Sequence, residues 1–405
     1  MAHPFLPFGL VRVGPAASTR TEMLRTAILL WICMSVGAAF ASGPHYLITN
    51  DDVVFFPTSL TFYTIEPNGL LTLSEQVFTG GYGISGGYFG ENRVAVLNSA
   101  SNQCVYASEA FTGDIVGVSV STLQIGGGAF GSETDTGVSN GIGLALNSQH
   151  LYASFTDSNA IGTFQIQPGC SLSFINDTSV VGLQGGFVAA MAVRGNTLVV
   201  TYGDGSIESF NVANGPPISN EDKQNSTASL RSHGASYPNG VDITQDGRFA
   251  IFGDTSTSEN VEVSDMSSGK LGKTVVYSSG ATINSSNLML SPDETLLFVS
   301  NTQGDQVTAA LFDKATGRIS AGCTSNKLKG YGTSWAYLGS MAVANPSGSG
   351  GTVYVAEFGP ESAIAIVQLS LSAGTCSLAE RAKSPVLDPN STGLLSISTF
   401  PPRSF

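Results

Sequence analysis

Four side chains have the chemistry needed for general acid–base catalysis. Arg231 and His233 lie in the long polar stretch 214–237. Asp242 interrupts a short apolar segment, and Glu357 ends another. A carboxylate held in a dry site can act as a general base once its pKa is raised. We take these four as candidate catalytic residues; the alternatives are a solvated loop for the first two and structural turn or edge carboxylates for the acids.

Three asparagines occupy equivalent places in a repeat described below. Asn140, Asn239 and Asn287 each stand just before a short apolar segment. A ring of amide oxygens there, with Asp242 nearby, predicts a site for a hard divalent cation such as Ca²⁺. The alternative is that Asn tolerates a tight turn and bonds its own backbone. No other cofactor is expected, because no G-x-S-x-G, phosphate-binding loop or haem-attachment motif occurs.

The composition excludes several classes of protein. Of 405 residues, 48 are Gly, 42% are hydrophobic and only 12% are charged, with a net charge of −13. Disorder requires lower hydrophobicity and more charge, and a long helical bundle requires more Ala, Glu, Lys and Leu. No basic cluster is present to neutralise a nucleic-acid backbone. An all-β protein that does not bind nucleic acid remains.

Residues 1–41 have the pattern of an export signal. Arg25 precedes the apolar run 27–40, and Ala39-Phe40-Ala41 is an A-x-A cleavage site. The run is shorter than the roughly 20 residues of a membrane span. Met23 is the expected start, and an uncleaved anchor is the alternative. The mature chain, with a charge of about −15, is predicted to be secreted or extracytoplasmic, periplasmic in a Gram-negative host, monomeric and without stable membrane insertion.

Four cysteines lie in the predicted mature chain. They are Cys104, Cys170, Cys323 and Cys376. Their spacing matches no zinc module, and no C-x-x-C occurs. An oxidising compartment permits two disulfides in any of three connectivities, and free buried thiols are the alternative.

The elements that must position these residues come from a repeat of about 50 residues. Apolar tetrads followed by Ser/Asn/Asp/Gly-rich turns begin at residues 46, 94, 151, 198, 249, 297 and 353. An alternating strand follows each turn, and a further short strand precedes most tetrads, so each unit holds about four antiparallel strands. Such units are typical of propeller blades. We therefore predict one seven-bladed β-propeller domain over 42–405; a stack of sandwich domains is the rival.

The two chain ends are predicted to close the ring. Tyr46 opens the first unit at its second strand, so that unit lacks an innermost strand. Residues 394–400 can supply it, which leaves no free innermost sheet edge.

The segments 237–254 and 290–301 resemble the lactonase-type β-propellers, which include bacterial 6-phosphogluconolactonases and fungal carboxymuconate-cyclising enzymes. The resemblance implies a ligand site at one mouth of the central channel, with charged residues from several blades. The chain departs from the pattern: Ser236-Tyr-Pro-Asn-Gly240 replaces a P-R-H-like run, and the usual Val-Asn-Glu end of the second strand is absent.

Two functions follow as hypotheses. The first is an exported propeller that binds a small molecule or an extracellular protein or surface partner at its channel mouth. The second, implied by the resemblance, is a lactone hydrolase or lactonising cyclase acting through the candidates above. The departures from the family pattern favour the first hypothesis.

Overall fold

The computed structural model describes residues 45–402, apart from 54–55, 85–91, 131–142, 157, 220–221, 226–239, 254–259, 279–284, 302–303, 333–336, 348–349, 359–360, 373–374 and 395. The predicted signal 1–41 lies outside these residues. Within the described part of the chain, no helix has the length and apolarity required to span a bilayer.

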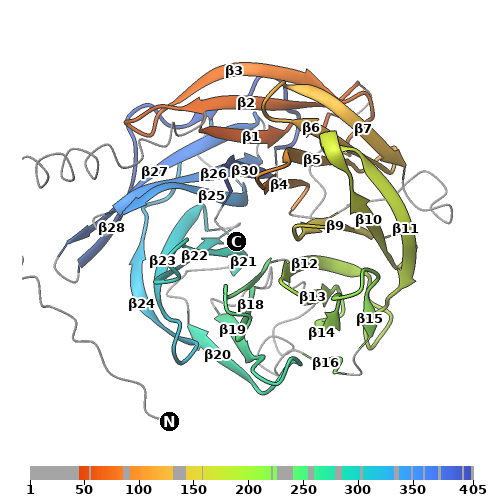
Figure 1. Ribbon diagram of the computed structural model, residues 1–405. Helices are drawn as coiled ribbons and strands as arrows, with labels where there is room; N and C mark the ends of the chain where they lie inside the picture. The colour runs from red at the N-terminus through yellow and green to blue at the C-terminus, as the bar shows by residue number, and fades with distance from the viewer. Residues whose placement is uncertain are drawn as a thin grey trace, which may run out of the picture. The chain divides into compact units, whose positions relative to one another are not determined.

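Seven antiparallel sheets are arranged as the blades of a ring (Figure 1), which confirms the predicted seven-bladed propeller. Four strands lie side by side from the centre outward in each blade, because tight polar turns separate short apolar segments.

The first four blades, each given from the centre outward, have the following strands. Blade 1 contains β30 (Ile397–Phe400), β1 (Tyr46–Asn50), β2 (Ser59–Ile65) and β3 (Leu71–Phe78). Blade 2 contains β4 (Val94–Asn98), β5 (Gln103–Glu109), β6 (Asp114–Ser119) and β7 (Gln124–Phe130). Blade 3 contains β8 (Leu144–Leu146), β9 (His150–Phe155), β10 (Ala160–Ile166) and β11 (Leu172–Ser179), with the 3₁₀ turn η1 (Pro168–Cys170) before β11. Blade 4 contains β12 (Val188–Arg194), β13 (Thr197–Tyr202) and β14 (Ser206–Asn211), with β15 (Ile218–Ser219) and β16 (Gln224–Asn225) both paired to β14.

The last three blades follow the same order. Blade 5 contains β17 (Gly240–Ile243), β18 (Phe249–Gly253), β19 (Asn260–Asp265) and β20 (Thr274–Ser278). Blade 6 contains β21 (Ser285–Leu290), β22 (Leu296–Asn301), β23 (Gln306–Asp313) and β24 (Arg318–Thr324). Blade 7 contains β25 (Tyr337–Ser347), β26 (Gly350–Phe358), β27 (Ala363–Ser372) and β28 (Thr375–Glu380), and β29 (Val386–Leu387) also pairs with β27.

The ring closes as predicted. The C-terminal strand β30 pairs antiparallel with β1 and occupies the innermost position of blade 1. Three strands from the start of the described chain and one from its end therefore share a sheet.

One tetrad has a different place from that expected. The tetrad at Val94 forms the innermost strand β4 of blade 2, whereas the other six lie in second strands. The second strand of blade 2 is β5, around Val105 and Tyr106. Innermost strands are buried on both sides and can be as continuously apolar as second strands, so composition alone does not separate the two.

Each innermost strand is antiparallel to the second strand of its blade. We call the face where innermost strands begin, and where second strands end, the loop face; the opposite face is the turn face. A contact between neighbouring blades joins two such starts: Ile397 N–H near the start of β30 donates to Ser340 Oγ near the start of β25, at 2.8 Å.

The core lies between the blades. Seven hydrophobic clusters of described residues each join the facing sides of two neighbouring blades. Buried tyrosines on second strands add directional contacts across these seams: Tyr152 Oη donates to Gly215 O at 3.2 Å, and Tyr354 Oη donates to Gly69 O at 3.0 Å. Gly69 has φ of 77°, and a side chain there would also meet Thr352.

Two disulfides join neighbouring blades. Cys104 of β5 is bonded to Cys170 of η1, which connects blades 2 and 3. Cys323 of β24 is bonded to Cys376 of β28, which connects blades 6 and 7. Of the alternatives left open by the sequence, the structure has this one connectivity.

Candidate functional site

A cavity of about 230 Å³ lies on the ring axis and is lined by residues of all seven innermost strands. Most of the lining is aliphatic, because small and branched side chains are what seven converging strands can accommodate. Seven polar residues complete the lining: Asn92, Arg194, Asp242, Asn287, Ser340, Ser398 and Thr399. The cavity therefore combines an apolar wall with a few polar groups, the usual composition of a small-molecule site.

Asp242 lies toward the turn-face end of the cavity. Its Oδ1 accepts a hydrogen bond from Ile243 N–H at 2.8 Å, and its Oδ2 accepts one from Leu290 N–H of the next blade at 2.8 Å. The guanidinium of Arg194, from the previous blade, lies 4.0 Å from Oδ1. The carboxylate of Asp242 thus links blades 5 and 6 and compensates the charge of Arg194. Both of its oxygens accept hydrogen bonds from backbone N–H groups.

Asn287 lies toward the loop-face end of the same cavity and is 7% exposed. It stands within β21, which begins at Ser285, whereas the sequence placed Asn287 just before the strand. Ser340 Oγ and the Asn92 amide lie at this end too, and Asn92 Nδ2 donates to Met191 O at 3.5 Å. Asp242 and Asn287 are thus two of the sequence-derived candidates that line one cavity.

Four of the other candidates fall outside the described residues: Arg231, His233, Asn140 and Asn239. Among the residues that are described, no group of three His, Cys, Asp or Glu side chains is placed to hold a metal ion. The proposed Ca²⁺ register is therefore represented in the structure by Asn287.

Glu357 does not line the cavity. It lies near the end of β26, is 1% exposed, and continues the face of Val353 and Val355 that packs against Phe298 of blade 6. Neither carboxylate oxygen has a hydrogen-bond partner among the described residues. Burial, followed by the charges of Glu380 and Asp305, raises the pKa of Glu357 to about 8. The side chain therefore keeps its proton at neutral pH.

Replacing Glu357 with glutamine is expected to make stability less dependent on pH. The raised folded-state pKa means that the native protein holds a proton that the unfolded chain has released, so the contribution of Glu357 to stability is greatest in acid and falls as pH rises toward 8. The loss between pH 6 and pH 8 from this group is about 2 kcal/mol. Urea unfolding at both pH values measures it.

The exposed Glu361 supplies the matched control, Glu361→Gln. The control should keep the wild-type pH dependence. Equal slopes for wild type, Glu357→Gln and the control would contradict a protonated, buried Glu357.

Glu357 belongs to a pattern that sequence reasoning missed. Asp51 directly after β1, Glu109 at the end of β5 and Glu357 near the end of β26 occupy corresponding places in three consecutive blades, 1, 2 and 7. All three are at most 1% exposed. Burial raises the pKa of Asp51 to about 8 and that of Glu109 to about 7. An acid at the end of the apolar strands that end near residues 51, 109 and 357 was the available signal.

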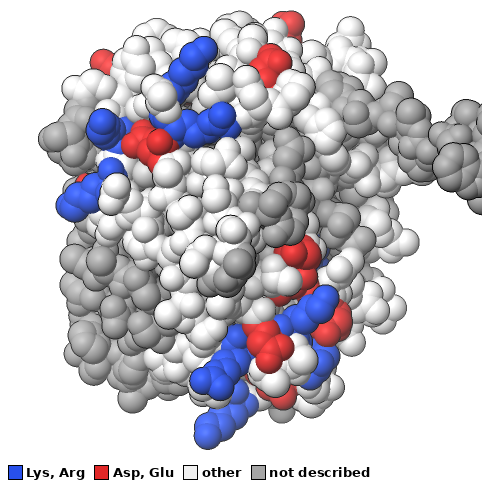
Figure 2. All heavy atoms as spheres, turned by 90° about the vertical axis from the view of Figure 1, so that its left-hand side faces the viewer, with Lys and Arg blue, Asp and Glu red and all other residues white. Residues whose placement is uncertain are grey.

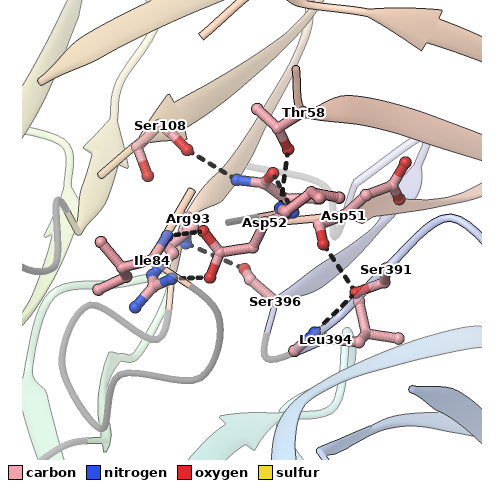
Figure 3. Close-up of polar contacts among 12 residues, drawn as sticks. Asp51, Asp52, Thr58, Ile84, Arg93, Ser108, Ser391, Leu394 and Ser396 are labelled. Carbon is pink, nitrogen blue, oxygen red and sulfur yellow. Dashed lines mark hydrogen bonds and ion pairs between the residues drawn. The ribbon is translucent and has the colours of Figure 1, made fainter. Parts of the chain in front are cut away.

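A second missed feature is a buried ion pair beside the ring closure (Figure 3). Arg93, just before β4, pairs through Nη1 with Asp52 Oδ2, and both residues are 1% exposed. Arg93 N–H also donates to Ser396 Oγ at 2.9 Å, just before β30. The pair therefore links blades 1 and 2 to the closing strand.

No protein-family model and no curated protein sequence matches the chain. Several solved structures, however, are similar to this chain. A Bacteroides fragilis protein described as a "putative 6-phosphogluconolactonase" aligns with a TM-score of 0.64 at 13% identity, over 89% of this chain and 99% of that one. A Bacteroides uniformis protein described in the same words aligns with a TM-score of 0.52 at 11% identity, over 69% of this chain and 81% of that one.

A third similar structure is the periplasmic gluconolactonase PpgL of Pseudomonas aeruginosa, with a TM-score of 0.50 at 14% identity, over 68% of this chain and 80% of that one. At such identities the likeness concerns the fold. This chain folds as a seven-bladed β-propeller of the kind found in these lactonase-type proteins.

Proposed function

We propose that the protein is an exported binding propeller that holds a small neutral molecule, such as a lactone, in its central channel. The observation that carries the proposal is the cavity of about 230 Å³ with aliphatic walls and polar groups at both ends. Its volume lies below the range of drug-sized pockets, so the ligand is small.

Charge favours a neutral ligand. Arg194 is the cavity's cationic side chain among the described residues, and Asp242 faces it at 4.0 Å. The whole chain carries a net charge of −13, which disfavours the approach of anions. An intact lactone therefore suits the channel better than the hydroxy acid formed by its hydrolysis.

Export is supported by the signal-like residues 1–41 and by two disulfides, which persist in oxidising compartments. On the side of the ring that carries β24 and β28, Figure 2 shows Lys and Arg in two separate groups, each with Asp or Glu beside it. The described residues of this side present no continuous basic stripe.

A lactone hydrolase is the second candidate, favoured by the fold shared with a gluconolactonase. Its chemistry would require a base beside the cavity. Asp242 is engaged by two backbone N–H groups there, and Glu357 lies away from the lining. Among the residues that the structure describes, binding without turnover therefore has the better geometric support; Arg231 and His233 lie outside them.

A matched pair of compounds tests the proposal. δ-Hexalactone is neutral, and 5-hydroxyhexanoate has the same carbon skeleton with a carboxylate. The lactone should raise the melting temperature in a concentration-dependent manner, and the acid should not. Asn287→Leu should weaken the effect, whereas Asn98→Leu, at an exposed position of β4, should leave it unchanged.

The same samples distinguish the two functions. Lactone opening can be measured by pH-stat titration of the acid that it releases. A rate above that of the uncatalysed reaction would establish the hydrolase instead. A melting temperature that is insensitive to both compounds would contradict the proposed site.

A further inference from the structure

The segment that closes the ring carries a buried acid pair unrelated to the channel. Asp388 lies between β29 and β30, and Asp51 follows β1 of blade 1. Their exposed fractions are 1% and 0%. The two residues are far apart in the chain but both lie at the seam between blades 7 and 1, where Thr61 Oγ1 donates to Asp51 Oδ2 and accepts a hydrogen bond from Asn390 Nδ2, two residues after Asp388.

Asp51 is surrounded by hydroxyl donors. Thr49 Oγ1 donates to Oδ1 at 2.9 Å, Thr61 Oγ1 donates to Oδ2 at 2.9 Å, and Ser59 Oγ also donates to Oδ2. At Asp388, Oδ1 accepts a hydrogen bond from Asn390 N–H at 3.2 Å, and the hydroxyl groups of Thr49 and Tyr63 face the carboxyl group.

The groups that face the pair bring no compensating cation. From β2, Tyr63 lies beside Asp388, and burial followed by the charges of Asp388 and Asp51 raises the pKa of Tyr63. The neighbouring Arg93 is paired with Asp52, and no described ion pair includes Asp51 or Asp388. Two neighbouring buried carboxylates without a cation cannot both be ionised at acceptable cost.

The closing segment is hydrogen-bonded to the surroundings of Asp51. Ser391 Oγ donates to the backbone O of Asp51 at 2.8 Å, and Asn390 Nδ2 donates to Thr61 Oγ1 at 3.3 Å. Because Thr61 Oγ1 also donates to Asp51 Oδ2, a change in the charge of this carboxyl group acts on the link between Asn390 and blade 1.

We propose that Asp51 and Asp388 form a proton-held latch: the ring is closed while the pair shares one proton, and loss of that proton frees the segment 388–400 from blade 1.

The direction of the pH dependence follows from the environment. Burial, and then the charge of Asp388, raises the pKa of Asp51 to about 8, and burial raises the pKa of Asp388 as well. The folded protein thus binds a proton more tightly than the unfolded chain does. The latch is strongest in acid and is lost as pH rises through about 8.

Hydrogen exchange of the full mature chain at pH 6 and pH 9, corrected for intrinsic rates, tests the latch. Peptides covering 386–400 should lose protection by about tenfold at pH 9, while peptides of β13 and β22 should change less. Asp388→Asn should keep 386–400 protected at both pH values, because a neutral amide can replace the protonated acid. Asp313→Asn, in an exposed turn of blade 6, should behave as wild type.

Infrared spectroscopy supplies a second readout that needs no opening. A buried carboxylic-acid C=O band should be present at pH 6 in the wild type and should be weaker in Asp388→Asn. Asp51→Asn should weaken the same band and is the variant to use if Asp388→Asn folds poorly. Equal protection of 386–400 at both pH values in wild type, or unchanged bands in both variants, would overturn the proposal.

Discussion

Replacing Arg93 with methionine is expected to lower the free energy of unfolding by about 3–5 kcal/mol. The guanidinium is buried with Asp52, and methionine would fill much of the volume while leaving a buried carboxylate without its counter-charge. Asp52 Oδ1 also accepts a hydrogen bond from Ile84 N–H at 3.1 Å, so the carboxylate is fixed in place and cannot turn toward solvent. The junction of blades 1 and 2 with β30 depends on this pair (Figure 3).

Urea unfolding at pH 7 measures the effect, and two further variants show its origin. Arg248→Met removes an exposed arginine that donates to Ala315 O at 3.1 Å, and should cost less than about 1 kcal/mol. Adding Asp52→Asn to Arg93→Met should recover part of the loss, because the uncompensated charge is removed. A loss for Arg93→Met no greater than for Arg248→Met would show that the ion pair adds nothing to the closed ring.

The architecture could be predicted from sequence because each blade repeats the same local sequence pattern. Apolar tetrads with polar turns define strands and hairpins within about 50 residues, and closure follows from the missing innermost strand at Tyr46. The error at Val94 has a physical reason. β4 and β5 are both largely buried and are joined by a short polar turn, so either could be read as the second strand of blade 2.

The site was predictable only in part. Asp242 and Asn287 sit at repeat positions that face the axis, so the repeat brings both to the cavity. Glu357 lies at the loop-face end of the second strand β26. Alternation of side chains along β26 turns Glu357 toward blade 6 instead of toward the cavity. Asp388 comes near Asp51 only through ring closure, and no local pattern specifies this neighbourhood. The Asp51-Asp52 doublet after an apolar strand was visible, but its partners were not.

Removing the Cys104–Cys170 disulfide is expected to destabilise the protein more than removing Cys323–Cys376. The bridged cysteines are 66 and 53 residues apart, and chain entropy assigns each bridge about 4 kcal/mol. The difference comes from packing. Cys104 and Cys170 are 0% and 2% exposed within the cluster between blades 2 and 3, so double replacement by alanine also leaves a cavity that adds about 1 kcal/mol. Thermal and urea unfolding of the two double-alanine variants compare these losses.

Burial also separates the two bridges under reducing conditions. Cys323 and Cys376 lie on the outermost strands of their blades and are half-buried, so dithiothreitol should reach this bridge in the folded protein. Reduction of Cys104–Cys170 must await the opening of blades 2 and 3, and its rate should follow unfolding. Alkylation of native protein under dithiothreitol, with mass spectrometry of the labelled peptides, resolves the order. If both pairs were labelled at the same rate below the unfolding transition, the seam between blades 2 and 3 would have to open independently of the rest of the ring.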